Sequence, residues 1–310
     1  MEGVDEFHPS FGEPGASFVY RPKPVMSSYH QEDAPVLEIS LPDKPMYMLF
    51  AHRVWRAGML LADAIYANYF PLSGQNVLEL GAGSGLPSLT AAVCTDAKKI
   101  VVSDYDDASI LAALRANLEK VRMQNILRAP IVVAPHTWGS SIEDVADLLS
   151  ARAPVLFDTI LLADCVWERF SHAALIKSIT NLLSRSSHAR VYMVAGLHTG
   201  RDTLVHFFRN MLDAKFVLTT VPGEWPSCSY PCHQDTWLTG SEHILELKVG
   251  GSLHETNLSA SSTNPRNPQT LTAAPRILHE RRPFITQSDN HESIQERNQW
   301  LTVSCFRWSM

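Results

Sequence analysis

The glycine-rich stretch of residues 81–85 is the first feature of this sequence that could do chemistry. Its glycines stand at positions 81, 83 and 85, between a short apolar run that includes Glu79 and a second apolar run that starts at Leu86. A glycine loop between a strand and a helix lets backbone N–H groups approach a ligand, because glycine has no Cβ and accepts positive φ. The dinucleotide fingerprint G-x-G-x-x-G would need glycine where Leu86 stands. The loop therefore predicts a ligand site without fixing the ligand.

Asp104 is the second residue that could bind a ligand. It ends the apolar run of residues 99–103. It also stands about 20 residues after the glycine loop, the offset at which a carboxylate meets the ribose hydroxyls of a nucleotide. A strand-terminal aspartate could instead cap the next helix, but Asp106 and Asp107 are better placed for that role. We therefore predict that Asp104 binds a ribose.

Aspartate and tryptophan residues follow two later apolar runs. Trp138 comes shortly after residues 131–134, where an indole could stack on a purine or cover the edge of a sheet. Asp164 and Trp167 follow residues 157–163, an apolar run typical of a strand buried on both faces of a parallel sheet. Asp164 could hold the proton of an amine or cap the following segment. The ring face of Trp167 could shelter a cation.

Two further aromatic residues have both a structural and a functional interpretation. Trp55 stands beside the apolar stripe of a helix expected at residues 53–69, so its indole could fill the core or form the wall of a ligand site. His198 follows an apolar run that ends near residue 196. We interpret His198 as an ordinary loop histidine, although it could also lie at the mouth of a site.

Apolar runs of strand length and helical patterns alternate between residues 76 and 221. This alternation predicts right-handed crossovers and an α/β fold with a doubly wound, mostly parallel sheet. In an open sheet of this kind, ligands bind at the carboxyl ends of the strands. The convergence of several candidate residues at these ends, rather than any one of them, predicts the site. They are Glu79, the glycine loop, Asp104, Trp138 and Asp164.

Composition limits the partners and the compartment. The 310 residues are 45% hydrophobic and 19% charged, which suits a globular chain rather than a disordered one. The net charge of −6 argues against a broad electrostatic grip on nucleic acid, and no apolar run approaches the ~20 residues that cross a bilayer. Five cysteines form no even framework, and the amino terminus is unlike a secretory signal. We expect a cytoplasmic protein that binds neither nucleic acid nor membrane. Cys228, Cys232 and His233 lack a second ligand pair, so no metal site is expected.

The ordered set of motifs resembles a known family. Glu79-Leu80-Gly81-Ala82-Gly83-Ser84-Gly85, followed by Asp104 after a second strand, is similar to the seven-stranded S-adenosylmethionine-dependent methyltransferases. A narrower set resembles the fungal branch called nicotinamide N-methyltransferase-like, which includes enzymes that methylate lysines or amino termini of proteins. That set is Val54-Trp55, Leu86-Pro87-Ser88, Asp104-Tyr105, Trp138-Gly139 and Ala163-Asp164-Cys165. The resemblance covers about residues 50–221. It implies a Rossmann-like sheet of seven strands with an antiparallel last strand.

The resemblance also implies a cofactor, S-adenosylmethionine, and a role for each matching residue. Gly81, Ala82 and Gly83 would lie along the methionine and ribose portions of the cofactor, and Asp104 would accept hydrogen bonds from the ribose. The full set implied to bind the cofactor is Trp55, Glu79, Gly81, Ala82, Gly83, Asp104, Tyr105, Trp138 and Ala163. Asp164 and Trp167 would act on the acceptor amine.

Four segments are expected along the chain. Residues 1–50 are rich in proline and are interpreted as an arm or lid. Residues 51–224 form the cofactor-binding methyltransferase core. Residues 225–296 hold many Pro, Ser, Thr and Asn residues, which is typical of a largely disordered insertion. Residues 297–310 contain the closing strand of the core, which would complete a hairpin split by that insertion. The strands expected outside the alternating part lie at residues 36–39, 243–249 and 300–308.

Methyl transfer to a nitrogen is the expected activity. A sulfonium methyl group is already activated, so rate comes from in-line placement of an unprotonated amine. Residues 49–53 and the insertion after Gly223 depart from the relatives that act on an elongation factor. We therefore expect a small amine metabolite as the acceptor, with a protein lysine or amino-terminal amine as the alternative. Two other classes stay open: an NAD-linked oxidoreductase, against which Leu86 counts, and an interaction protein that kept the fold without the activity.

Overall fold

The structure is a computed structural model of the chain. It describes residues 9–23, 25, 34–45, 50–142, 145, 156–228, 243–249, 278–284 and 292–309, and every structural statement below concerns these residues. Most of the segment 225–296, including Cys232 and His233, lies outside them. No helix in the described ranges is both long enough and apolar enough to cross a bilayer.

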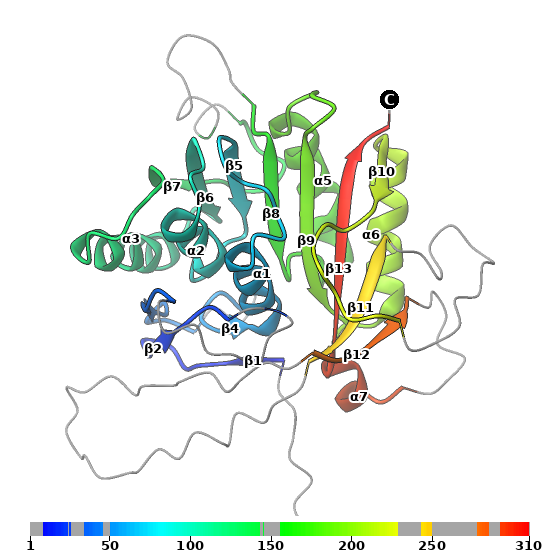
Figure 1. The fold of residues 1–310 in the computed structure, drawn as a ribbon, viewed down its shortest axis with the longest axis horizontal. Helices are drawn as coiled ribbons and strands as arrows, with labels where there is room; N and C mark the ends of the chain where they lie inside the picture. The colour runs from blue at the N-terminus through cyan, green and yellow to red at the C-terminus, as the bar shows by residue number, and fades with distance from the viewer. Residues whose placement is uncertain are drawn as a thin grey trace, which may run out of the picture.

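A nine-stranded sheet forms the centre of the molecule (Figure 1). The chain enters it at β5, moves outward to β7 and then returns to the other side of β5 with β8 and β9. The pairings among these five strands are all parallel, so the switch point lies between β5 and β8. Every residue of β5 is buried, as expected for a strand covered on both faces. In spatial order the parallel strands are β7 (Ile131–Pro135), β6 (Lys99–Asp104), β5 (Asn76–Leu80), β8 (Thr159–Ala163) and β9 (Arg190–Gly196).

The sheet continues through an antiparallel part centred on β13 (Trp300–Trp308). One side of β13 pairs with β9. The other side pairs with β11 (Ile244–Val249) along its first residues and with β10 (Phe216–Thr219) along its last residues. The seven expected strands of the core are all present, and the antiparallel last strand is confirmed. β11 is the strand considered at residues 243–249, and its pairing with β13 forms the expected hairpin.

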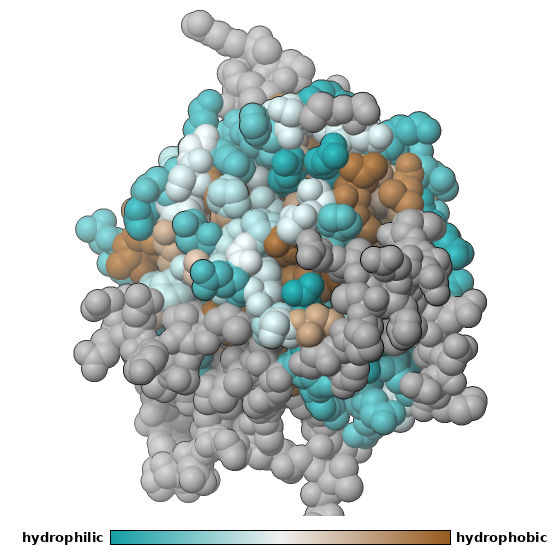
Figure 2. All heavy atoms as spheres, turned by 45° about the vertical axis from the view of Figure 1, so that its right-hand side comes forward, coloured by the Kyte–Doolittle hydropathy of each residue, from teal (hydrophilic) through white to brown (hydrophobic). Residues whose placement is uncertain are grey.

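Two elements within the predicted insertion belong to the folded structure in addition to β11. They are β12 (Leu278–Pro283), which pairs with β11, and the beginning of α7 (Ile294–Asn298). Ion pairs connect these elements to the core. Arg201 on α6 lies 2.5 Å from Glu246 on β11 and 2.9 Å from Glu292 before α7, and Arg282 on β12 pairs with the same two glutamates. Figure 2 shows this side of the molecule, where hydrophobic residues reach the surface in separate patches among hydrophilic ones.

Helices cover both faces of the sheet (Figure 1). Val77 and Leu78 are neighbours on β5, but they belong to two different buried apolar clusters, one on each face. This follows from the alternation of side chains along a strand. Leu61, Leu89 and Leu114 belong to the first cluster, and Leu175 and Phe207 belong to the second. The helices of the first face are α1 (Arg56–Tyr66), α2 (Leu86–Cys94) and α3 (Ala108–Met123), and those of the second are α5 (His172–Leu182) and α6 (Arg201–Asp213).

The amino-terminal arm packs on α1 and α3 and forms a small sheet of its own. β2 (Ser17–Tyr20) pairs with β3 (Leu37–Ser40), so the strand expected at residues 36–39 is present but shifted by one residue. The Tyr20 hydroxyl donates to the buried Asp63 carboxylate on α1. The Asn117 side chain on α3 bonds both the N–H and the carbonyl of Ser40, at 2.7 and 2.9 Å. These buried hydrogen bonds fix the described part of the arm to the core.

A second two-stranded sheet joins β1 (Ser10–Phe11) to β4 (Val54–Trp55). The Arg53 guanidinium supports this pairing by donating to Ser10 Oγ at 2.8 Å, and Arg56 N–H donates to the Pro9 carbonyl at 3.0 Å. The pairing holds residues 54 and 55 extended. The helix expected from residue 53 therefore begins only at Arg56, and the expectation that Trp55 lies within it is wrong.

Candidate active site

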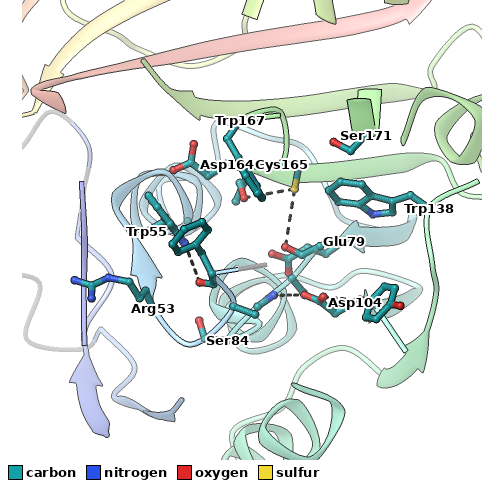
Figure 3. A pocket seen from close by; sticks show the side chains of 18 of the residues that line it. Arg53, Trp55, Glu79, Ser84, Asp104, Trp138, Asp164, Cys165, Trp167 and Ser171 are labelled. Carbon is teal, nitrogen blue, oxygen red and sulfur yellow. Dashed lines mark hydrogen bonds between the residues drawn. The ribbon is translucent and has the colours of Figure 1, made fainter. Parts of the chain in front are cut away.

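A pocket of about 450 Å³ opens at the carboxyl ends of β5, β6 and β8 (Figure 3). This is the switch point of the sheet, where open α/β folds bind ligands. All the residues predicted as site residues line this one pocket. They are Trp55, Glu79, Gly81, Ala82, Gly83, Asp104, Tyr105, Trp138, Ala163, Asp164 and Trp167. The structure therefore brings together residues that are far apart in the sequence, while their individual roles stay predictions.

Glycine is needed at two positions of the loop for different reasons. Gly81 has φ of +65°, and a Cβ there would lie 2.8 Å from Trp138 Cζ2 and 3.0 Å from Cys165 Sγ. Gly83 has φ of +53°, and no atom lies within 4 Å of where its Cβ would be. Gly81 thus lets Trp138 and Cys165 pack against the loop, whereas Gly83 keeps space open inside the pocket.

Asp104 is buried at the end of β6. Its Oδ2 accepts a hydrogen bond from Gly83 N–H at 2.6 Å, and its Oδ1 accepts one from Tyr105 N–H at 2.7 Å. Burial raises the pKa of Asp104 to about 6, although both hydrogen bonds favour the charged form. Asp107 caps α3 by accepting from the N–H groups of Ser109 and Ile110, so the prediction that a later aspartate caps this helix is confirmed, while ribose binding by Asp104 stays a prediction. The Asp104 carboxylate is thus available to the pocket.

Glu79 on β5 is fully buried and only half satisfied. Its Oε2 accepts a hydrogen bond from Ser88 N–H at 3.0 Å, but its Oε1 has no partner among the described residues. Burial raises the pKa of Glu79 to about 8, with a smaller contribution from the nearby Asp104 charge. A buried polar atom without a partner costs about 1–3 kcal/mol. A cation or hydrogen-bond donor placed in the pocket would remove that cost.

We expect the Glu79→Gln variant to be more stable than the unchanged protein, by an amount that grows with pH. The folded pKa of Glu79 is raised, so between about pH 4.5 and pH 8 the folded state keeps a proton that the unfolded state releases. Stability is therefore lost as pH rises through this window, at no more than about 1.4 kcal/mol per pH unit for one proton. Glutamine cannot titrate and can still accept from Ser88 N–H. Urea unfolding of both proteins at pH 5, 6, 7 and 8 measures the effect, and equal pH slopes would contradict it.

Asp164 stands just after β8 with φ of 57°, in the left-handed region. A non-glycine residue held there costs about 1–2 kcal/mol, and such strain gathers at functional sites. Its Oδ1 accepts a hydrogen bond from Gly196 N–H at 2.9 Å, at the end of β9. The short helix that follows, Arg169–Ser171, has Glu168 and not Asp164 at its N-terminal cap, so the alternative in which Asp164 caps that segment is wrong. The carboxylate is buried and lines the pocket.

Three aromatic residues, Phe50, Trp55 and Trp167, form an aromatic wall of the pocket, and His198 packs against it. The Phe50 ring meets the Trp167 ring edge to face at 5.6 Å and the Trp55 ring at 6.2 Å. The Trp55 ring stacks on the His198 ring at 5.0 Å. His198 and Asp164 both lie against Gly196, where a Cβ would lie 2.6 Å from His198 Nδ1 and 3.4 Å from Asp164 Oδ1. His198 therefore supports the wall and is not a plain loop histidine.

Phe50, Glu168 and Phe170 are among the pocket-lining residues that sequence reasoning did not predict as site residues. Phe50 has φ of 51° and precedes β4 in a stretch without periodicity, so no pattern marks it. Glu168 and Phe170 directly follow Trp167, and their closeness to that residue was the only available signal. Phe170 is 75% exposed and Tyr105 is 47% exposed. The mouth of the pocket therefore presents aromatic rings to the solvent.

Comparison with known proteins identifies similar sequences over the part of the chain that forms the site. Residues 40–214 match the family described as lysine methyltransferase. The protein N-terminal and lysine N-methyltransferase efm7 of Schizosaccharomyces pombe is 34% identical over 156 residues, which are 50% of this chain and 60% of that protein. EFM7 of Cryptococcus neoformans var. neoformans serotype D is 30% identical over 195 residues, 60% of this chain and 61% of that protein. The chain thus spans about three fifths of the length of these two relatives.

Similarity to solved structures is weaker. Precorrin-6y C5,15-methyltransferase from Geobacter metallireducens is 11% identical and covers 81% of this chain, which in turn covers 88% of that protein, with a TM-score of 0.43. The description of the fold therefore depends on the strand order and pairing given above and not on this similarity.

Proposed function

This chain belongs to the lysine methyltransferase family, and from that premise we propose that it transfers a methyl group from S-adenosylmethionine to an amine of a protein. One observation carries the proposal. A single pocket combines the glycine loop and two buried carboxylates, which suit the cofactor, with Asp164 and the aromatic wall, which suit an amine. The two halves meet where the methyl group would have to be transferred.

The cofactor half of the pocket fits S-adenosylmethionine on two counts. The unpartnered Oε1 of Glu79 offers an acceptor to the ammonium group of the cofactor once that group replaces the proton of the carboxyl, and the open space at Gly83 leaves room beside the loop. Asp104 would accept from the ribose hydroxyls and Trp138 would border the adenine, with Gly81, Ala82 and Tyr105 along the same side. When bound, the cofactor supplies a methyl group on a positively charged sulfur. The protein's part is to hold the acceptor in line with that group.

The acceptor half of the pocket is built for a basic nitrogen. The Asp164 carboxylate is fixed by Gly196 N–H through Oδ1, which leaves Oδ2 to receive or hold the proton that an amine must lose before it can attack. The Trp167 and Phe50 rings, in edge-to-face contact, present an aromatic surface to a cationic amine. Trp55 closes the wall and also lies beside the cofactor half.

A protein amine is favoured over a small metabolite as the acceptor. The relatives that match are named for methylation of protein amino termini and lysines. These names support a protein lysine or amino-terminal amine as the acceptor better than the small amine metabolite expected from the sequence. The exposed rings of Phe170 and Tyr105 at the mouth also suit an acceptor that extends beyond the pocket. Membership in the narrower nicotinamide N-methyltransferase-like branch stays a proposal.

Transfer of label decides the acceptor class. The protein is incubated with S-adenosylmethionine carrying a labelled methyl group and a desalted cell extract, and the products are separated into macromolecules and small molecules. Label in a protein band, released on hydrolysis as methylated lysine or a methylated terminal amino acid, is the expected result. Label that enters only the small-molecule pool would overturn the choice of a protein acceptor. No label in either pool, together with stabilisation by NAD but not by S-adenosylhomocysteine, would overturn the proposal altogether.

The Asp104→Asn variant is expected to bind S-adenosylhomocysteine about tenfold more weakly than the unchanged protein. Asparagine keeps one oxygen acceptor for Gly83 or Tyr105 N–H, but it removes the charge that strengthens a hydrogen bond to a hydroxyl. Titration calorimetry at pH 7.5 measures the affinity. Asp107→Asn is the matched control, because asparagine still caps α3 and Asp107 does not line the pocket. Equal affinities for all three proteins would show that Asp104 does not contact the ribose.

A further inference from the structure

A pair of histidines, one fully buried and one half-buried, lies behind the segment that carries Asp164 and Trp167. His172, the first residue of α5, is fully buried, and its Nε2 lies 3.0 Å from the carbonyl oxygen of Val166. Its Nδ1 lies 2.9 Å from Nδ1 of His206 on α6. Val166 stands directly before Trp167, so the pair connects α6 to the backbone of the pocket segment through one side chain.

The hydrogen-bond pattern indicates which histidine nitrogen donates and which accepts. The Val166 carbonyl can only accept, so His172 Nε2 must carry a hydrogen and donate it. In a neutral ring the other nitrogen is then an acceptor. His206 Nδ1 is therefore the donor to His172 Nδ1, 2.9 Å away. The side-chain amide of Asn210 lies farther from the same His206 atom, at 3.4 Å, and can accept from it when the amide oxygen faces the ring. Burial lowers the pKa of His172, and the nearby His206 and Arg169 add to that effect against the opposing bond to Val166, which is consistent with the neutral ring.

The position of the pair points to a role in the site rather than in the core alone. His172 Nδ1 is buried, and without His206 it would have no partner, which costs about 1–3 kcal/mol and leaves the ring free to turn away from Val166. His206 is only half-buried, so little apolar packing depends on it. Among the described residues, the two rings contact Val166, Phe207 and Asn210, none of which lines the pocket. The segment that would move carries Trp167, whose ring meets Phe50 in the aromatic wall.

We propose that His206 and His172 are positioning residues for the acceptor half of the pocket: His206 orients His172, which holds the Val166 carbonyl and so places the Trp167 ring and the Asp164 carboxylate for the amine. This inference rests on the proposed function for its kinetic consequence. Its structural consequence, a fixed orientation of the Trp167 ring, does not depend on that function. Misplacement of an acceptor by a fraction of an ångström lowers the rate of transfer steeply.

Two substitutions of His206 separate the hydrogen bond from the ring. In His206→Phe a ring remains but the donor is lost. In His206→Asn the amide N–H takes the place of Nδ1–H and restores the donor. His188→Phe is the matched control, because His188 is exposed in the turn before β9 and lies outside the pocket lining. For each full-length protein we would measure KM and kcat for the amine acceptor, affinity for S-adenosylhomocysteine, and the ¹⁹F signal of 5-fluorotryptophan at position 167. Trp167→Phe assigns that signal.

His206→Phe is expected to lower kcat/KM for the acceptor about tenfold, to shift or broaden the Trp167 signal, and to leave the affinity for S-adenosylhomocysteine within about twofold. His206→Asn is expected to recover most of both losses, and His188→Phe to match the unchanged protein. The proposal is overturned if His206→Phe leaves the Trp167 signal in place, or if asparagine does no better than phenylalanine. Absence of any methyl transfer by the unchanged protein would instead count against the proposed function, and the ¹⁹F comparison would still decide the role of the histidines.

Discussion

Replacing Asp164 with asparagine is expected to lower kcat/KM for the amine acceptor by about 10²- to 10⁴-fold, the range in which a positioned acid or base contributes. The substitution changes little else. Asparagine tolerates the left-handed backbone that Asp164 adopts at φ of 57°. Its amide oxygen can still accept from Gly196 N–H. What is lost is the negative charge that would hold the proton of the amine.

The measurement is steady-state transfer of labelled methyl to the acceptor, with cofactor affinity determined separately. Asp158→Asn is the control, because Asp158 directly precedes β8, at the end of that strand opposite to Asp164. Its Oδ2 accepts a hydrogen bond from the backbone N–H of Asn76, and the amide oxygen of asparagine can accept the same bond. Cofactor affinity should stay within about twofold in both variants. Activity in Asp164→Asn close to that of the control would show that the charge of Asp164 plays no part in the reaction.

The Gly83→Ala variant is expected to bind S-adenosylhomocysteine on the order of 100-fold more weakly than the unchanged protein, and to lose methyl transfer in step. A Cβ at this position meets no atom of the protein within 4 Å, so the added methyl group would occupy space that the cofactor needs. Forcing extra atoms into a close-packed contact costs about 1–3 kcal/mol. Gly81→Ala would not test the space for the cofactor, because its Cβ would collide with the Trp138 side chain of the protein itself.

Gly74→Ala is the control for the backbone cost of alanine at Gly83. Gly74 has φ of +74°, also with nothing within 4 Å of its Cβ position, but it stands before β5 and outside the pocket lining. Both alanine variants should therefore lose about 1–2 kcal/mol of stability from the left-handed backbone, measured by urea unfolding. Only Gly83→Ala should lose affinity. If both bind S-adenosylhomocysteine equally well, the cofactor does not lie along residue 83.

The parallel half of the sheet and the pocket-lining residues at the ends of its strands could be predicted because their signals are local. The apolar runs that became β5, β6 and β8 are continuous, and the residues that end them point to one edge whatever the details of packing. Asp104 and Asp164 needed no knowledge of the tertiary structure beyond that rule. The same holds for Trp138, which lies after the end of β7.

The rest could not be predicted because it depends on contacts between distant segments. Trp55 was expected in a helix, yet the pairing of β1 with β4 holds it extended, and no helical period reveals an isolated two-residue strand. Phe50 belongs to the aromatic wall because its backbone takes a left-handed conformation and its ring meets Trp167. β12 lies within a stretch whose composition suggested disorder, and the buried ion pairs of Arg282 with Glu246 and Glu292 hold it.

The pairing of Ser10 and Phe11 with Val54 and Trp55 has a practical consequence for work at the bench. Ser10 and Phe11 help to position the indole of Trp55, because they pair with the two-residue strand to which it belongs. A shortened version that starts after residue 11 would lack β1 and, with it, the pairing that holds Trp55 extended. Loss of activity in such a shortened protein would reflect the missing strand β1 and would say nothing about the activity of the native enzyme.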